Sequence, residues 1–514
     1  MSASSSLQPP SSLLSTQGVH LVGDFVSKCG LSQSARDIVE VIRHLGIPAE
    51  ILDLPIFPER EAEKQEQLRH PLPYPKPASR LSLFSFNADL VPAIAHSLPR
   101  HYFENRYIIG TWFWETENFP PHHAAGMDYV DEIWVASQHI QHALQKIAPV
   151  PVKLYTHLIH PPRLVEGTAL PPFLDNDRFV FLFCYDFRSI AERKNPTGTC
   201  EAFIKAFPEA LPDGPLCILK SVAAHPGHTM EYLDLQRRFR HRPDIIFMDG
   251  YLPAAERDAL MNRADCYVSL HRAEGLGLTL LESMSLGKPC IGTAYSGNMD
   301  FMSPENSWLI PCRMIQVGPR RWPFDADTLW ADPDLDAAAA AMREAWSNPE
   351  VLREKAHQAR LTATTRHHMD NVAAGIQSLL EEAMTKPARP KPGFNSVKEE
   401  GAEKSNRTLA YESLRKAKAI HKEARGTVKT IKGWRVPAGL QPLLQNILEI
   451  QKLNQQTQHL ILNELGSLKQ QNRGFDAPAF ERLLTDQERS ARVLSDLVPG
   501  LWNRGESTTP LSQL

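Results

Sequence analysis

The sequence lacks several features that would assign it to a simple class of protein. No segment approaches the roughly 18 consecutive apolar residues that a membrane-spanning helix needs. Its 7 cysteines include no C-x-x-C pair, which argues against a zinc site or a disulfide scaffold and favours reduced thiols in a cytosolic protein. The net charge is only −3, so the chain as a whole is not built to bind nucleic acid.

What is present indicates more than one domain, because 514 residues exceed a single ordinary core. Residues 1–17 are polar and lack the basic start and apolar core of a signal peptide, so we expect a disordered leader. Apolar strand-like runs alternate with helix-patterned segments in residues 18–170 and again in residues 171–385. This alternation predicts an α/β fold with two Rossmann-like domains, the second ending in a long returning helical tract over 335–385.

The remaining residues predict a linker and a helical C-terminal extension. Residues 386–406 are rich in proline and charge, 407–474 have helical patterning, and 475–514 suit a short helix and a loose tail. The basic segment 404–435 could lie on an anionic membrane surface or be a solvated linker helix. The apolar spacing in 440–470 suits either an oligomerising coiled coil or a helix packed on the body of the protein.

A glycine turn flanked by two carboxylates is the strongest functional pattern. Glu274-Gly-Leu-Gly277 follows an apolar run and precedes a helix that we predict over Thr279–Leu286. Glycines permit a tight turn, and the free N–H groups at a helix start favour an anion such as phosphate. The carboxylates of Glu274 and Glu282 would accept hydrogen bonds from sugar hydroxyls. Thr279-x-x-Glu282 also matches a capping box, so Glu282 has a purely structural alternative.

The string Glu274-Gly-Leu-Gly-Leu-Thr-Leu-Leu-Glu282, followed by Gly287-Lys-Pro and Ser296-Gly-Asn, resembles the donor motif of retaining glycosyltransferases of family 4. The similarity extends over most of residues 18–385. It implies a GT-B fold with the active site in a cleft between two domains, and a nucleotide-sugar donor with no further cofactor. The donor-binding residues that it implies are Gly30, Arg188, Arg193, Lys194, Glu274, Gly275, Leu276, Gly277, Leu278 and Glu282.

Within that set, the resemblance gives individual roles to the two acids and to the cations. Glu282 would bind the donor ribose, and Glu274 would contact the transferred sugar. Lys194 suits the place of a cation against the diphosphate, and Arg188 fits by its spacing, although Arg193 is a rival because relatives with an Arg-Lys-Asn-Pro string carry a small residue at the position of Arg188. Fixed positive charge of this kind would replace a metal ion.

We therefore expect no metal site. The D-x-D strings Asp175-Asn-Asp177 and Asp325-Ala-Asp327 lie in turn-like segments.

On the acceptor side, Gly110-Thr-Trp-Phe-Trp-Glu115 ends a predicted strand, and its aromatic residues could equally be core. Family members often carry a histidine in this region, whereas this chain has Glu115, which could position or deprotonate an acceptor hydroxyl.

Two functions remain open. The first is a retaining hexosyltransferase, with Glu115, Glu274 and Lys194 as catalytic residues, that moves a sugar to a glycan or lipid-linked acceptor in the assembly of a surface polysaccharide or glycoconjugate. The second is a catalytically degenerate scaffold of the same fold that acts through its helical tail. In either case we expect a cytoplasmic protein that could lie on the inner face of the membrane.

Overall fold

The structure of the protein is a computed structural model that describes residues 9–54, 77–222, 228–319, 321, 323–392, 435–437 and 508–510. The chain divides into two compact units, residues 1–392 and 393–514. In the second unit, the described residues form the short strands β15 (Arg435–Pro437) and β16 (Thr508–Pro510), which pair antiparallel. The predictions of membrane contact through 404–435 and of a coiled coil in 440–470 lie outside the described residues.

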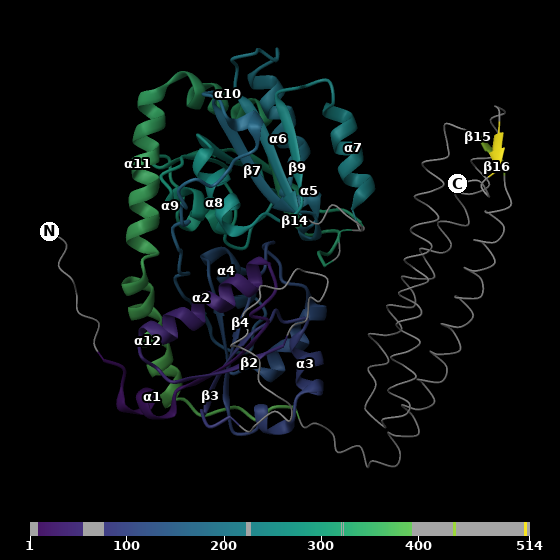
Figure 1. Ribbon diagram of the computed structural model, residues 1–514. Helices are drawn as coiled ribbons and strands as arrows, with labels where there is room; N and C mark the ends of the chain where they lie inside the picture. Colours follow the sequence, from purple (N-terminus) through teal and green to yellow (C-terminus); the bar gives the residue numbers. More distant parts are fainter. Residues whose placement is uncertain are drawn as a thin grey trace. The chain divides into compact units, whose positions relative to one another are not determined.

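The first α/β domain contains a parallel six-stranded sheet in the order β2-β1-β3-β4-β5-β6 (Figure 1). Strands β1, β3, β4 and β5 are buried at every position, as strands covered on both faces require. The strands are β1 (Val19–Gly23), β2 (Ala49–Asp53), β3 (Leu81–Ser85), β4 (Tyr107–Thr111), β5 (Glu132–Val135) and β6 (Val152–Leu154). The helices are α2 (Gly30–His44), α3 (Val91–Ser97), α4 (Gln138–Gln145), η1 (Arg100–Tyr102) and η2 (Pro121–Tyr129).

The second α/β domain repeats this plan with a parallel sheet in the order β12-β11-β10-β7-β8-β9. Its strands are β7 (Val180–Asp186), β8 (Leu216–Val222), β9 (Ile245–Asp249), β10 (Cys266–Ser269), β11 (Cys290–Thr293) and β12 (Ser307–Ile310). Its helices are η3 (Pro172–Leu174), η4 (Phe187–Ser189), α5 (Ala191–Lys194), α6 (Pro196–Ala206), α7 (Thr229–Phe239), α8 (Ala254–Arg263), α9 (Leu278–Ser285) and η5 (Gly297–Asp300). The predicted α/β fold of two Rossmann-like domains is confirmed.

The strand orders locate the places where such folds bind ligands. In the second sheet the chain order reverses between the neighbouring strands β7 and β10, and in the first sheet between β1 and β3. Open parallel sheets bind ligands beyond the carboxyl ends of the strands at such switch points. The segments that follow β7 and β10 carry Arg188, Lys194 and the glycine turn, so the local topology gathers the predicted donor residues at one edge.

The predicted single helical tract over 335–385 is three helices, α10 (Leu335–Ser347), α11 (Pro349–Arg366) and α12 (Met369–Thr385). The side chain of Asn348 accepts a hydrogen bond from the N–H of Val351 at 3.2 Å, so Asn348 ends one helix and caps the next. Helix α11 packs on α9 of the second domain, and α12 packs on α2 of the first (Figure 1). The chain therefore crosses back to the first domain before residue 392.

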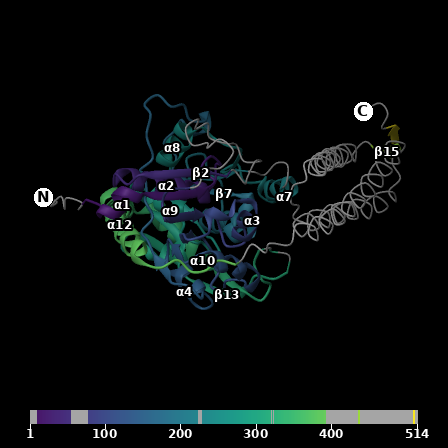
Figure 2. The same cartoon turned by 90° about the horizontal axis from the view of Figure 1, so that it is seen from below.

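Both ends of this body differ from the predicted boundaries. Residues 12–17, which we expected within a disordered leader, form α1 (Ser12–Gln17), and Leu14 is fully buried. Helix α1 lies beside α12 in both views (Figure 1, Figure 2). The segment after α12 continues to Pro392, where Lys391, whose side chain is 4% exposed, forms an ion pair with the buried Asp131. The start of the linker predicted over 386–406 is thus fixed to the first domain.

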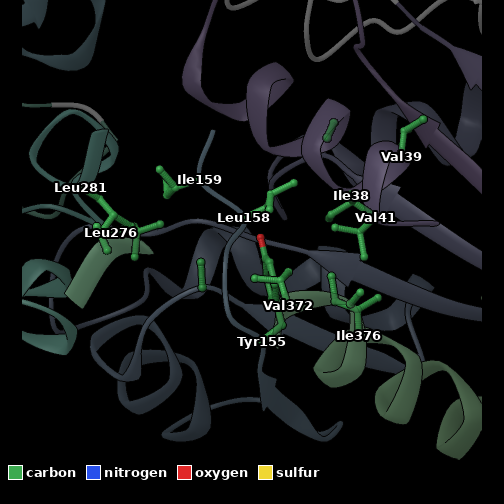
Figure 3. Close-up of a cluster of buried hydrophobic side chains, with 14 of the residues drawn as sticks. Ile38, Val39, Val41, Tyr155, Leu158, Ile159, Leu276, Leu281, Val372 and Ile376 are labelled. Atoms are coloured by element: carbon green, nitrogen blue, oxygen red, sulfur yellow. The ribbon is translucent and has the colours of Figure 1, made fainter. Parts of the chain in front are cut away.

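One buried apolar cluster joins the two domains, because it contains side chains from α2, α9, α12 and the connecting segment. Figure 3 shows Leu158 and Ile159 of the connection between Ile38 of α2 and Leu281 of α9. No helix in the described part of the chain is long and apolar enough to cross a membrane.

Candidate functional site

The glycine turn, residues 274–277, connects strand β10 to helix α9. Gly277 has φ of +93° and is the residue before the helix, a conformation that favours glycine. Gly275 is needed for a different reason: a Cβ atom there would lie 3.0 Å from the carbonyl oxygen of Trp114, which belongs to the first domain. The close approach that this glycine allows is therefore to the backbone of the opposite domain.

The capping-box alternative for Glu282 is wrong. Helix α9 begins at Leu278, and its N-cap residue is Gly277, which has no side chain to accept a bond. Thr279 is consequently the second residue of the helix, so Glu282 stands too far along to close a capping box. Within the described residues, no hydrogen-bond donor reaches the Glu282 carboxylate. Burial raises the pKa of Glu282 to about 7, and Arg257 only partly offsets that rise.

Glu274, in contrast, is a fully paired carboxylate. Its Oε1 atom lies 2.5 Å from Nζ of Lys194, and its Oε2 atom lies 3.4 Å from Nη1 of Arg193. Burial alone would raise the pKa of Glu274, but Lys194, Arg193 and His271 outweigh burial and lower it to about 2. The carboxylate is therefore ionised at neutral pH, and it faces the two cations of the segment after β7.

The side chain of Arg193 is engaged in contacts within the protein. Its side chain is 4% exposed, and it donates to the carbonyl oxygens of Ser189 at 3.1 Å and Ala273 at 2.7 Å. Its Nη2 atom also lies 3.5 Å from Oε1 of Glu115. Arg193 thus links a carboxylate of the first domain to Glu274 of the second.

The guanidinium of Arg188 differs from that of Arg193 in its hydrogen bonding. Its backbone N–H donates to the Asp186 side chain at 2.8 Å, which holds the short turn after β7. Its guanidinium Nη1 atom is buried, yet none of the described residues accepts a hydrogen bond from it. A buried guanidinium donor without an acceptor is unusual, since such groups are normally satisfied. Arg188 therefore has the free donors that an anionic ligand would use, whereas Arg193 does not.

The segment that carries these cations is held in place by Asn195. This residue adopts a left-handed conformation with φ of +59° and ends α5 directly before α6. Its side-chain oxygen accepts from the N–H of Gly198 at 3.1 Å, and its side-chain nitrogen donates to the Leu270 carbonyl at 2.8 Å. Lys194 is consequently fixed beside the end of β10, where burial lowers its pKa and Glu274 partly restores it.

The first domain contributes Glu115 and Gly30. Glu115 follows β4, and its backbone carbonyl accepts from the His139 ring at 2.8 Å. Gly30 begins α2, and a Cβ atom there would lie 3.6 Å from a methyl group of Leu278, so the first turns of α2 and α9 face each other. The structure thus brings Glu115, Arg193, Lys194 and Glu274 into one chain of contacts. Gly30 and Leu278 lie together at another point of the domain junction.

Sequence reasoning missed the buried partners that support the glycine turn. His271 is fully buried and lies 3.0 Å from the Asn298 side chain and 3.1 Å from the Ser269 hydroxyl. Ser296 accepts from the N–H of Glu274 at 2.8 Å. The Ser296-Gly-Asn string was the only sequence signal for this support. In the described ranges, no three His, Cys, Asp or Glu side chains gather into a group that could hold a metal ion.

Comparisons with known proteins agree with this architecture. Residues 189–316 match the family model described as glycosyl transferases group 1. A solved glycosyltransferase from Rickettsia africae is 12% identical, with 72% of this chain and 100% of that one covered at a TM-score of 0.54. Sucrose-phosphate synthase from Thermosynechococcus elongatus is 14% identical, with 72% and 99% covered at a TM-score of 0.51.

A third structure, the pneumococcal O-GlcNAc transferase in complex with UDP and GlcNAc, is 16% identical at a TM-score of 0.41. The aligned part covers 60% of this chain but only 57% of that protein. No curated protein matches the sequence at a significant level.

The matched residues 189–316 include Arg193, Lys194, the glycine turn and Glu282, and they begin directly after Arg188. The two structures with the higher TM-scores share the arrangement of two parallel sheets over about 70% of the chain. The central part of the second domain is therefore similar to glycosyl transferases of group 1, in a chain that has the GT-B fold.

Proposed function

We propose that this protein transfers a sugar from a nucleotide-sugar donor to a glycan or lipid-linked acceptor with retention of the anomeric configuration. One observation carries the proposal. At the switch point of the second sheet, the buried Nη1 atom of Arg188 has no hydrogen-bond partner among the described residues, and the half-buried Glu282 carboxylate accepts no hydrogen bond from them. Unpaired buried polar groups are costly, so this arrangement suits the binding of a ligand with both anionic and hydroxyl groups.

The two unpaired groups match the two ends of a nucleoside diphosphate. The guanidinium of Arg188 would bind a phosphate, and the free N–H groups at the start of the eight-residue helix α9 would bind further phosphate oxygens. Glu282, one turn along the same helix, would accept hydrogen bonds from the ribose hydroxyls. The ribose assignment rests on the resemblance to retaining glycosyltransferases together with the failure of the capping-box alternative.

Lys194, Glu274 and Glu115 would act on the reacting groups. Lys194 supplies fixed positive charge where the diphosphate leaves, an electrostatic role that needs no metal ion. Glu274 stays ionised because of its low pKa, so it can accept hydrogen bonds from hydroxyls of the transferred sugar. Glu115, which reaches the same site from the opposite domain, would position or deprotonate the acceptor hydroxyl. Arg193 would lie between the two carboxylates without contacting the donor.

The alternative function is a non-catalytic scaffold that has kept the fold. The intact cation and carboxylate set favours the enzyme, because a scaffold would have no need for an unpaired buried guanidinium. Membrane contact through 404–435 and self-association through 440–470 remain proposals from the sequence. They suit an enzyme that meets a lipid-linked acceptor at a membrane surface.

The test is the release of nucleoside diphosphate from a panel of nucleotide sugars, with mixed glycan and polyprenyl-lipid acceptors added. We expect release from one of the nucleotide sugars by the wild-type chain and much slower release by Glu274→Gln, which keeps the side-chain size but removes the charge. Equal release by both proteins would contradict the role of Glu274. Nucleotide binding without any release would favour the scaffold.

A further inference from the structure

An antiparallel hairpin interrupts the second domain between β12 and α10. It consists of β13 (Cys312–Gln316) and β14 (Leu329–Pro333), and we call residues 312–333 the arm. Its ladder extends past the two strands, because the N–H of Val317 donates to Thr328 at 2.8 Å and that of Gly318 to Ala326 at 2.9 Å.

The base of the arm is fastened to the strand end that precedes the glycine turn. The N–H of Ala331 donates to the carbonyl of Arg272 at 2.8 Å, and the Arg272 guanidinium donates to Asp332 at 2.6 Å. The same guanidinium lies over the Trp330 ring at 5.8 Å. Arg272 is two residues before Glu274, and its own N–H donates to Arg193 at 2.7 Å. The base of the arm is therefore rigidly connected to the donor side of the site.

The tip of the arm touches the opposite domain. The Phe324 ring lies 5.2 Å from the Trp114 ring at an angle of 64°, and both side chains are buried. The carbonyl of Trp114 lies against Gly275. Trp114 therefore contacts two segments of the second domain, the glycine turn and the tip of the arm.

Trp114 immediately precedes Glu115, and the position of the Glu115 carboxylate depends on how this loop is held. The Glu115–Arg193 contact is 3.5 Å, longer than a well-formed hydrogen bond, so it does not by itself fix the carboxylate. The described rings that pack on Trp114 are those of Phe119, His123 and Phe324. Of these, only Phe324 comes from the second domain. It can therefore hold the loop that carries Trp114 and Glu115 in a fixed position relative to the donor residues.

We propose that Phe324 is a positioning residue: the tip of the arm holds Trp114, and through it Glu115, in register with the donor carboxylate Glu274. The catalytic consequence rests on the proposed function, since it assumes that Glu115 meets the acceptor. The contact itself does not depend on that assumption. The arm would thereby couple the acceptor side and the donor side whenever the two domains are together.

The test uses the full chain with Phe324→Ala, the conservative variant Phe324→Tyr, and the matched control Met314→Ala. Met314 lies on β13 of the same arm, but its side chain is 39% exposed. We expect faster hydrogen exchange of the peptide covering 112–116 in Phe324→Ala, and wild-type exchange in the other two. Because the base of the arm is intact, binding of nucleoside diphosphates, measured by calorimetry, should be the same in all four proteins.

With a nucleotide sugar that the wild type turns over, Phe324→Ala should lower kcat by about 10- to 100-fold at an unchanged KM for the donor, because a small misplacement of a reacting group is costly. Phe324→Tyr should restore most of the rate. Unchanged exchange at 112–116, faster exchange with an unchanged kcat, or an equal loss of nucleotide binding would each overturn the proposal. If the wild type binds no nucleotide, the proposed function fails, and the exchange measurement still decides whether the tip holds the loop.

Discussion

Replacement of Glu282 by alanine separates a ligand-binding carboxylate from a structural one. This carboxylate accepts no hydrogen bond from the described residues, and burial raises its pKa to about 7. Its removal therefore deletes no stabilising contact and relieves the cost of a buried acid. A hydrogen bond to a charged group contributes about 1.5–3 kcal/mol, so nucleotide affinity should fall by about 10- to 150-fold.

Calorimetric titration with nucleoside diphosphates and a thermal unfolding scan measure the two effects on the same protein. We expect weaker binding with a Tm that is unchanged or slightly higher. The isosteric variant Glu282→Gln serves as a control, because it keeps the shape and loses only the charge. A variant that loses several degrees of Tm yet binds nucleotide normally would show that Glu282 supports α9 after all, and would refute the reasoning.

The raised pKa of Glu282 also predicts the direction in which nucleotide affinity changes with pH. The usual pKa of a glutamic acid is 4.5, whereas Glu282 in the folded protein stays protonated until about pH 7. Between these two pH values the unfolded chain has lost the proton and the folded chain still holds it, so the stability of the fold falls as the pH rises. The ionised carboxylate is the better acceptor for ribose hydroxyls, so wild-type affinity should rise between pH 6 and pH 8, above any rise in Glu282→Gln. Parallel pH profiles of the two proteins would contradict this assignment.

Further predictions concern the cations, the metal and the tail. Arg188→Ala should weaken binding of a nucleoside diphosphate but not of the nucleoside, with little change in Tm, since the guanidinium has no described partner; equal loss for both ligands would contradict a phosphate contact. Arg193→Ala should lower the free energy of unfolding by about 1–3 kcal/mol, as measured by denaturant titration, because it removes the donors to the Ser189 and Ala273 carbonyls and one of the two cations beside Glu274; a neutral result would argue against its structural role. Sugar transfer should persist in EDTA, and loss of turnover that magnesium or manganese restores would refute metal independence. The segment 404–435 has ten basic and two acidic residues, hence +8, and each basic residue near an anionic leaflet contributes about 1 kcal/mol. The full chain should therefore sediment with anionic liposomes at low salt, and a chain ending at Pro392 should not.

The parallel sheets were predictable because their strands are buried on both faces. Such strands appear as continuous apolar runs, and Phe179–Tyr185 matches β7 to within one residue at each end. The arm gave no such signal: β13 is a mostly exposed edge of a two-stranded sheet and reads Cys-Arg-Met-Ile-Gln. The boundary between α10 and α11 at Asn348-Pro349 was visible in the sequence, since an N-cap residue followed by proline marks a helix start. It was overlooked because the apolar periodicity continues on both sides of it.

The site itself was predictable as a set of residues but not as a set of contacts. The sequence could not separate Arg188 from Arg193, because both are arginines in one short segment after β7. Only the folded chain shows that the Arg193 guanidinium contacts carbonyls and carboxylates, whereas none of the described residues accepts a hydrogen bond from the buried Nη1 atom of Arg188. The capping alternative for Glu282 likewise depended on Thr279 as the N-cap residue, whereas the N-cap is Gly277, two residues earlier.

The central claim is that the carboxyl edge of the second sheet binds a nucleoside diphosphate through Arg188 and Glu282, whose side chains form no hydrogen bond with the described residues. Calorimetric titration of the wild-type chain and of Arg188→Ala with UDP, GDP, ADP and dTDP, in buffer containing EDTA, tests this claim directly. The account predicts saturable binding of at least one of them by the wild type, and clearly weaker binding of that same nucleotide by Arg188→Ala. No heat from any of the four, or equal affinity for the two proteins, would contradict it.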